Sequence, residues 1–363
     1  PLGVVAGITP FNFPVMVPLW MFPLAIAAGN SFILKPSEKD PLSTMFLVEL
    51  FNETKAPKGL LNLVNGEKEL VNALIKDKRI KAVSFVGSTP VAKSIYENSA
   101  LNGKRCQALG GAKNHALILS DANIEYTTDQ IISAAFGSSG QRCMALSVAV
   151  VSSDIKEKFI SGLKNKTKTL NFGLDELNSN SFGPLISKEH LKKVEGYIEL
   201  SKKEGAKLLV DGREGIKGKN SKSGYFIGPT IIDNVTTDME SYKNEIFGPV
   251  LQIIEVENML EGIKIINENI YGNGCCIFTD SGESAKSFSE NTGIGMVGIN
   301  VPLPVPSSFH SFGGWKDSLF GDLNIYGPDG LRFYTQRKTI TQRWPNSGKS
   351  NGIDLSMPNN LKQ

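Results

Sequence analysis

Apolar runs and amphipathic stretches alternate along the first hundred residues of the chain. Short runs of aliphatic and β-branched residues predict strands at residues 2–8, 31–34, 60–64 and 82–86. Apolar residues at helical spacing predict helices between them, at residues 15–28, 42–52, 67–76 and 89–98. Strands and helices that alternate over short connections are typical of a parallel α/β sheet.

A second α/β unit follows with the same pattern. The sequence predicts strands at residues 115–119, 145–152, 206–211, 251–255, 274–278 and 296–299. It predicts helices at residues 124–136, 155–170, 188–204 and 283–291. Alternation predicts one more strand at 331–341, and polar composition predicts a loop at 212–223 and a loose tail at 345–363.

Composition narrows the class of protein. A chain of 363 residues can form two or three packed units. The net charge of +3 is small and the basic residues are scattered, which argues against a nucleic-acid partner. Three prolines interrupt the apolar stretch 13–28, which argues against a membrane span.

Cysteines and histidines bear on the compartment and on metals. Four cysteines are too few for a secreted disulfide scaffold, so we expect a reducing intracellular setting. Three widely separated histidines argue against a metal site. The chain starts at Pro1 in a strand-like run and not in a signal peptide, so we expect a preceding segment, where any targeting peptide would lie.

A glycine pattern at residues 293–298 matches the G-x-G-x-x-G of dinucleotide sites. That site needs a strand before the glycines and a helix after them. Here a helix-like run precedes the glycines and a strand-like run follows. We therefore interpret them as a helix end followed by a strand, and not as a cofactor site.

Cys143 is the strongest single candidate for chemistry. It lies between a predicted helix and a predicted strand, after the small residues 137–140, where a substrate can reach it. The neighbouring Arg142 favours the thiolate, which is the nucleophilic form. Most cysteines are buried small hydrophobic residues, and Cys143 taken alone leaves that alternative open.

Two turns at the ends of predicted strands suit a nucleotide. Lys35, Ser37 and Glu38 follow the strand 31–34, where a lysine and a glutamate can bind ribose hydroxyls. Gly87 and Ser88 follow the strand 82–86 and open a helix, whose free N–H groups suit a pyrophosphate. Taken alone, these are better explained as a solvated turn and a serine helix cap.

Two proline-containing loops add an amide, a carboxylate and a ring. Asn12, in the loop 9–14, has an amide that can donate to a developing oxyanion. Glu245 and Phe247 precede a Gly-Pro break, where the carboxylate can hold a sugar hydroxyl and the ring can line a flat heterocycle. A turn asparagine and an ordinary loop are the alternatives.

In this order along nearly the whole chain, these motifs resemble those of the aldehyde dehydrogenase superfamily. The resemblance makes Cys143 the nucleophile and Asn12, in the Phe-Asn-Phe-Pro stretch, the oxyanion donor. It implies NAD contacts at Phe11, Lys35, Ser37, Glu38, Gly87, Ser88, Glu245 and Phe247. The implied α/β fold has a Rossmann-like cofactor domain, an α/β catalytic domain and an oligomerisation arm.

One stretch departs from the superfamily pattern. Its members usually carry Glu-Leu-Gly-Gly-Lys, whose glutamate activates water for hydrolysis. Here residues 106–115 place Ala108 or Leu109 at the glutamate position, according to the register chosen. Neither side chain can take a proton, so release of the acyl group needs a better nucleophile. The thiol of coenzyme A ionises far more readily than water.

The CoA-dependent methylmalonate-semialdehyde dehydrogenase branch is similar in three further stretches. They are residues 111–115, 142–145 and 333–341. The resemblance implies oxidation of methylmalonate or malonate semialdehyde, loss of carbon dioxide and formation of propionyl-CoA or acetyl-CoA. A carboxylate substrate needs a cationic partner, for which Arg142 is the candidate; a surface or backbone-binding arginine is the alternative. Leu109 and Gln141 replace the branch's usual Asn and frequent Glu.

The resemblance also implies an organisation and leaves two other functions open. It implies an NAD-binding domain at 1–111, a catalytic domain at 112–321, a return segment with an oligomerisation strand at 322–344 and a flexible tail at 345–363. It implies a homo-oligomer, a dimer or homotetramer, in the mitochondrial matrix of a eukaryote or otherwise in the cytoplasm. A hydrolytic aldehyde dehydrogenase is one alternative, and a non-catalytic member or inactive shortened chain is the other.

Overall fold

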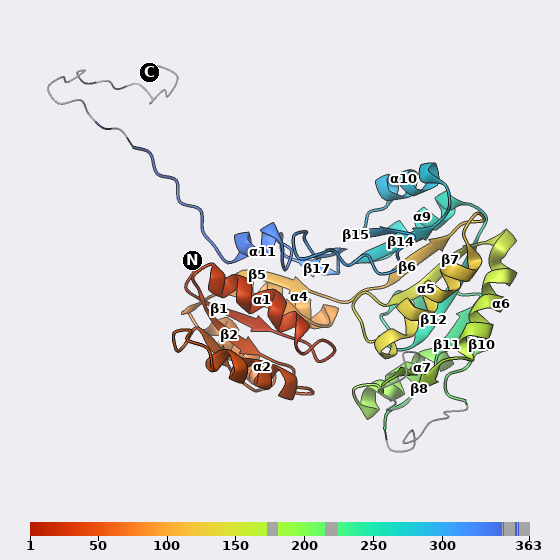
Figure 1. Ribbon diagram of the computed structural model, residues 1–363, viewed down its shortest axis with the longest axis horizontal. Helices are drawn as coiled ribbons and strands as arrows, with labels where there is room; N and C mark the ends of the chain where they lie inside the picture. Colours follow the sequence, from red (N-terminus) through yellow and green to blue (C-terminus); the bar gives the residue numbers. More distant parts are fainter. Residues whose placement is uncertain (173–180, 215–223, 343, 345–352, 354, 356–363) are drawn as a thin grey trace.

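Two β-sheets flanked by helices form two lobes of the molecule (Figure 1). The computed structural model describes residues 1–172, 181–214, 224–342, 344, 353 and 355. The first lobe holds the N-terminal strands and the second holds most of the chain after residue 114. The strand β17 (Leu319–Phe320) returns from the second lobe and pairs antiparallel with β5 of the first.

The first sheet has the order β17-β5-β4-β1-β2-β3, and the strands β1 to β5 are parallel. Its strands are β1 (Val4–Ile8), β2 (Ser31–Lys35), β3 (Leu61–Leu63), β4 (Ile80–Val86) and β5 (Arg105–Leu109). Its helices are α1 (Met16–Ala27), α2 (Leu42–Asn52), α3 (Lys68–Lys76) and α4 (Thr89–Leu101). Successive strand residues enter two core clusters on opposite faces, as Val5 and Ala6 show.

The second sheet has the order β10-β11-β12-β7-β6-β14-β15, and only β10 among its described pairings is antiparallel. Its strands are β6 (Asn114–Ile118), β7 (Leu146–Ser152), β10 (Lys207–Val210), β11 (Thr230–Asp233), β12 (Val250–Val256), β14 (Gly274–Phe278) and β15 (Met296–Ile299). The helices around it are α5 (Ile124–Phe136), α6 (Lys156–Thr167), α7 (Lys188–Lys203), α8 (Glu240–Lys243), α9 (Met259–Glu268) and α10 (Gly282–Asn291).

Shorter elements complete the description. They are the 3₁₀ helices η1 (Gly137–Gly140) and η2 (Ser153–Ile155), the paired strands β8 (Asn171–Phe172) and β9 (Ser181–Phe182), the paired strands β13 (Tyr271–Gly272) and β16 (Trp315–Lys316), and the helix α11 (Pro328–Phe333).

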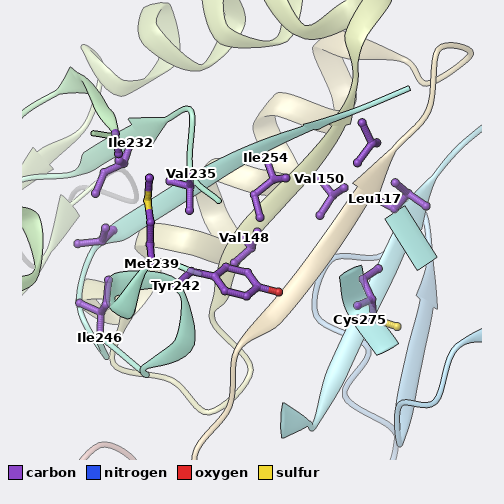
Figure 2. Close-up of a cluster of buried hydrophobic side chains, with 14 of the residues drawn as sticks. Leu117, Val148, Val150, Ile232, Val235, Met239, Tyr242, Ile246, Ile254 and Cys275 are labelled. Atoms are coloured by element: carbon purple, nitrogen blue, oxygen red, sulfur yellow. The ribbon is translucent and has the colours of Figure 1, made fainter. Parts of the chain in front are cut away.

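One face of the second sheet packs on a cluster of aliphatic side chains (Figure 2). Leu117, Val148 and Ile254 come from three neighbouring strands and point to the same side. Tyr242, from α8, lies among them, and its hydroxyl is 2.9 Å from a ring nitrogen of His115 on β6. Burial lowers the pKa of His115 to about 3, so this ring is neutral. The pair fixes α8, which leads directly into one wall of the site.

Most predicted elements are confirmed, and the glycine pattern at 293–298 does follow a helix, α10, and run into a strand, β15. The predicted strand at 331–341 is wrong. Residues 328–333 form α11, and 334–342 have no regular structure in the single chain. Arg105 Nη1 donates to the carbonyls of residues 332, 333 and 335 and so holds the start of this segment in a turn. Residues 336–342 are exposed and pair with no described strand.

Some elements were not predicted, and some predictions fall outside the described residues. β5 was not predicted, although it carries Ala108 and Leu109. Most of the loop 212–223 and nearly all of the tail 345–363 lie outside the part that the structure describes. No described helix is long and apolar enough to cross a membrane.

Candidate active site

The site lies where the carboxyl edge of the first sheet faces the amino edge of the second. The loops that follow β1, β4 and β5 meet the segments that precede β7 and β12. They enclose a cavity of about 350 Å³, called here the first cavity. The predicted site residues that line it are Phe11, Asn12, Gly87, Ser88, Cys143, Glu245 and Phe247. Parallel sheets bind ligands at this edge because strand ends leave loops and helix N-termini free.

The backbone of Cys143 is held by two asparagine amides. Asn114 Nδ2 donates to the Cys143 carbonyl at 2.9 Å, and Asn273 Nδ2 donates to the same oxygen at 3.0 Å. Asn114 Oδ1 in turn accepts the backbone N–H of Gly274 at 3.0 Å. Two separate segments, around Asn114 and Asn273, therefore fix the peptide that carries the thiol.

The thiol of Cys143 is protonated at neutral pH in this structure. Burial, and to a lesser extent the negative charge of Glu245, raises its pKa to about 12. Arg142 and the backbone N–H groups of residues 143 and 144 lower it, but by less. The expectation that Arg142 favours the thiolate is therefore right in direction, but desolvation outweighs the arginine in the chain on its own.

Asn12 is oriented by the segment that precedes Cys143. Its Nδ2 donates to the carbonyl of Gln141 at 2.8 Å. The Gln141 side chain is itself fixed, since its Oε1 accepts the backbone N–H of Ile186 at 3.1 Å. An amide carries two N–H donors, so one remains for a ligand in the cavity that Asn12 shares with Cys143.

Two aromatic rings frame the first cavity. Phe11 and Phe247 meet edge to face with their ring centres 6.1 Å apart. Phe247 has a φ of +60°, which is rare for a residue with a side chain and marks stored strain. A ring nitrogen of His190 lies 2.7 Å from the Phe247 carbonyl and holds that conformation as a donor.

Glu245 is tied to the loop that follows β5. Its Oε1 accepts the backbone N–H of Ala112 at 2.9 Å. A side chain at Gly111 would lie 2.6 Å from Oε2, so the glycine makes room for the carboxylate. Burial raises the pKa of Glu245, whereas Lys193 and Lys113 oppose that rise.

Lys113 secures the segment that presents Glu245. Its Nζ donates to the carbonyls of Ser241 and Asn244, both at 2.9 Å. Burial lowers the pKa of Lys113 to about 7, against the pull of the Glu245 charge. The lysine therefore supports the wall of the cavity from behind.

Ser88 stands at the N-cap of α4, but its side chain makes no capping hydrogen bond. The interpretation as a plain serine cap is therefore wrong. The hydroxyl and the first N–H groups of this 13-residue helix are left for a ligand in the cavity. Gly87 lies over the ring of Phe85, where any side chain would collide.

Lys35, Ser37 and Glu38 lie at the end of β2, outside the lining of the first cavity. Lys35 is 4% exposed, and its Nζ forms a 2.8 Å ion pair with Glu38. The next residue, Lys39, does line the cavity, with its Nζ 6.0 Å from the centre of the Phe11 ring. The turn at residues 35–38 therefore lies at the rim of the first cavity, and the other predicted cofactor-binding residues lie in its wall.

A second cavity, of about 230 Å³, also borders Cys143. Its apolar lining consists of Phe13, Met16, Trp20, Met144, Leu303, Val305 and Phe312. Its polar lining is Ser138, Arg142 and the Cys143 thiol. Arg142 Nε donates to Ser138 Oγ at 3.1 Å, and no carboxylate within the described ranges pairs with the guanidinium.

No carboxylate stands at the position of the missing glutamate. Ala108 is fully buried and Leu109 is 5% exposed, in a strand paired on both sides. Leu109 belongs to the core cluster against which Cys143 packs. The acidic side chains that line the first cavity are Glu189 and Glu245.

Sequence reasoning missed several residues of the site. His190 and Lys193, on α7, line the first cavity, and Asn273 holds the nucleophile's carbonyl. These are single polar residues in ordinary helical or loop contexts, and no motif in the sequence marks them. Ser138 is recognisable only in the structure, where its backbone is left-handed.

The chain is similar to proteins of one family. A family model described as the aldehyde dehydrogenase family matches residues 1–340. A malonate-semialdehyde dehydrogenase of Pseudomonas aeruginosa is 52% identical over 359 residues, which are 99% of this chain and 72% of that protein. The crystal structure of a methylmalonate-semialdehyde dehydrogenase from Oceanimonas doudoroffii is 57% identical with a TM-score of 0.94, covering 96% of this chain and 71% of that one.

A further similar structure was solved with NAD bound. It is a putative methylmalonate-semialdehyde dehydrogenase from Sinorhizobium meliloti complexed with NAD. It is 47% identical to this chain with a TM-score of 0.93, and it covers 96% of this chain and 71% of its own.

Proposed function

The chain belongs to the aldehyde dehydrogenase family, and from that premise we propose that it oxidises malonate or methylmalonate semialdehyde. The reaction uses NAD and coenzyme A, releases carbon dioxide, and forms acetyl-CoA or propionyl-CoA. The observation that carries the proposal is the position of Cys143 between two cavities, with Ala108 and Leu109 where a hydrolytic base would stand.

The first cavity fits a nicotinamide dinucleotide. The free Ser88 hydroxyl and the N-terminus of α4 suit a pyrophosphate, and Glu245 suits a ribose hydroxyl. The rings of Phe11 and Phe247 offer flat apolar surfaces. Lys35, Ser37 and Glu38, at the rim, would bind the second ribose. When bound, NAD supplies the acceptor for the hydride that leaves the substrate carbon.

Cys143 attacks the aldehyde carbon after losing its proton. The backbone N–H groups of residues 143 and 144 and the Arg142 charge support the thiolate. The free N–H of Asn12 and the N–H of Cys143 stabilise the negative oxygen that forms on the substrate. Departure of hydride from this tetrahedral carbon leaves a thioester on the sulfur.

The second cavity would hold the rest of the substrate. A small acid fits its apolar walls, and its carboxylate meets the guanidinium of Arg142. Loss of carbon dioxide from the bound acyl group leaves an electron pair on the neighbouring carbon, delocalised into the thioester oxygen. Asn12 stabilises this charge again, and protonation of the carbon gives the acetyl or propionyl thioester.

Release of the product needs an incoming thiol. Coenzyme A attacks the thioester carbon and displaces Cys143 as a thiolate, which restores the enzyme. Water is a poor rival here, because no carboxylate lies at residues 108 and 109 to take its proton. The hydrolytic alternative would need Glu245 or Glu189 for that task.

Product analysis tests this proposal. Enzyme, NAD and malonate semialdehyde are incubated with and without coenzyme A, and acetyl-CoA, acetate and NADH are measured. We expect about one NADH per active site without coenzyme A and continuous turnover to acetyl-CoA with it. Continuous release of a free acid without coenzyme A would support the hydrolytic alternative.

We also propose that copies of the chain associate and that it works in a reducing intracellular compartment. Residues 336–342 are exposed and run away from both lobes (Figure 1), so their backbone is available to another chain. All four cysteines lie in the described part and are free thiols. Light scattering coupled to size exclusion tests association, because deletion of 336–363 should lower the molar mass to that of one chain.

A further inference from the structure

Gly137 is a glycine for a reason other than its backbone. It ends α5 with φ −55° and ψ 139°, values that any residue adopts. A Cβ built on it would lie 2.7 Å from Cζ and 2.9 Å from Nη1 of Arg142, and still closer to Nη2. The guanidinium therefore occupies the volume that a side chain at position 137 would fill.

Ser138 holds the same guanidinium from the other side. Its hydroxyl accepts a hydrogen bond from Arg142 Nε at 3.1 Å. Its φ of 52° and ψ of 35° are left-handed, a conformation that serine rarely adopts and that turns its side chain toward the arginine. Ser138 and Arg142 both line the second cavity beside Cys143.

We propose that Gly137 and Ser138 form a seat for Arg142 that sets the preference for aldehydes bearing a carboxylate. The inference rests on the proposed function. Guanidinium has five N–H donors, and the seat uses only the one on Nε. No described residue accepts from the Nη groups, which can therefore meet a carboxylate in a cavity with apolar walls, where charge attraction is stronger than in water. Gly137 and Ser138 are positioning residues, since they act through Arg142.

The Gly137→Ala variant tests the seat with little risk to the fold. Alanine suits the observed φ and ψ, and the side chain that it displaces is the flexible end of an arginine. We expect KM for malonate semialdehyde to rise about tenfold and kcat to change by about twofold at most. The ratio of kcat/KM for malonate semialdehyde to that for propanal, which has no carboxylate, should fall about tenfold.

Two serine variants form a matched pair. Ser138→Gly removes the hydroxyl and suits the left-handed backbone, and it should lower the same ratio by about threefold. Ser139→Gly makes the equivalent change at the next residue, whose φ is 56° and whose hydroxyl donates to the Gly183 carbonyl. This control should leave the ratio unchanged, because Ser139 does not touch Arg142.

A double-mutant cycle decides whether Gly137 acts through Arg142. In an Arg142→Gln background, Gly137→Ala should not lower the ratio further. A ratio that falls equally in both backgrounds, or that stays unchanged in Gly137→Ala alone, overturns the seat.

A second measurement does not depend on turnover. Malonate should slow alkylation of Cys143 by iodoacetamide in the wild type and about tenfold less effectively in Gly137→Ala. If the wild type fails to oxidise malonate semialdehyde but shows this difference in protection, the proposed function fails and the seat stands. If turnover is present and protection is equal in both proteins, the seat fails and the proposed function stands.

Discussion

The two cavities that meet at Cys143 are built in opposite ways. The first is surrounded by groups anchored to backbone at several loops, such as Glu245 on the Ala112 N–H and Asn12 on the Gln141 carbonyl. The second has apolar walls and one cation, Arg142, with which no described carboxylate pairs. Many modest polar contacts suit a large dinucleotide, whereas a single charge in an apolar frame suits a small acid.

The difference also separates two kinds of specificity. Residues of the first cavity should affect every aldehyde in the same way, because they serve the cofactor and the oxyanion. Residues of the second should affect only aldehydes that carry a carboxylate. Cys143 belongs to both cavities, so its loss should erase the distinction.

Removal of the nucleophile has the largest expected effect. Cys143→Ala should lower kcat/KM for malonate semialdehyde and for propanal alike by roughly 10⁴-fold or more, a loss typical of removing a nucleophile. The absorbance of the NADH that forms measures both reactions. Unfolding curves of the variant serve as the control, since a buried thiol-to-methyl change keeps the packing. Retained NADH formation would remove Cys143 from the mechanism.

Loss of the oxyanion donor comes second. Asn12→Ala should lower kcat by about 10²–10³-fold for both substrates, as expected for one donor to a developing negative charge. The matched variant Gln141→Ala leaves the Asn12 amide in place but removes the side-chain bond from Ile186, so it should lose far less. A loss of kcat confined to malonate semialdehyde would mean that Asn12 serves the second cavity and not the first.

The same contrast explains what the sequence could reveal. The first cavity is built from loops at strand ends, and strand ends are recognisable from apolar runs that stop at glycine, proline or serine. Asn12, Ser88 and Glu245 were therefore found as candidates. Their partners were not, because the bond from Asn12 to Gln141 joins residues 129 positions apart.

The second cavity could not be predicted in the same way. Its walls come from α1, η1 and the segment 303–312, which have no motif in common. Arg142 was found only as a neighbour of Cys143, and the sequence did not show that burial outweighs its effect on the pKa of the thiol, because burial cannot be read from a sequence. The strand expected at 331–341 failed for a similar reason, since a distant Arg105 holds residues 332–335 in a turn.

Removal of the positive charge in the second cavity has the third-largest expected effect. Arg142→Gln should raise KM for malonate semialdehyde about 10- to 100-fold, because a charge-assisted bond to the substrate is lost. Its kcat/KM for propanal should fall much less, which steady-state kinetics with both aldehydes will show. Equal losses for both would mean that Arg142 serves the thiol and not the substrate.

The smallest effect is a shift in the reactivity of Cys143 caused by the first cavity. The charge of Glu245 helps to hold the pKa of the thiol near 12. Glu245→Gln removes that charge but keeps an oxygen for the Ala112 N–H, so the thiolate is destabilised less and the pKa should fall. Below its pKa the thiolate fraction rises about tenfold per pH unit, and the rate of alkylation by iodoacetamide should rise with the same slope. At each pH this rate should be higher in Glu245→Gln than in the wild type. The expected gain at pH 8 is severalfold, measured without NAD, and Glu189→Gln is the matched control at the same cavity wall. An alkylation profile that does not move in Glu245→Gln would show that the two cavities are electrostatically independent at the sulfur they share.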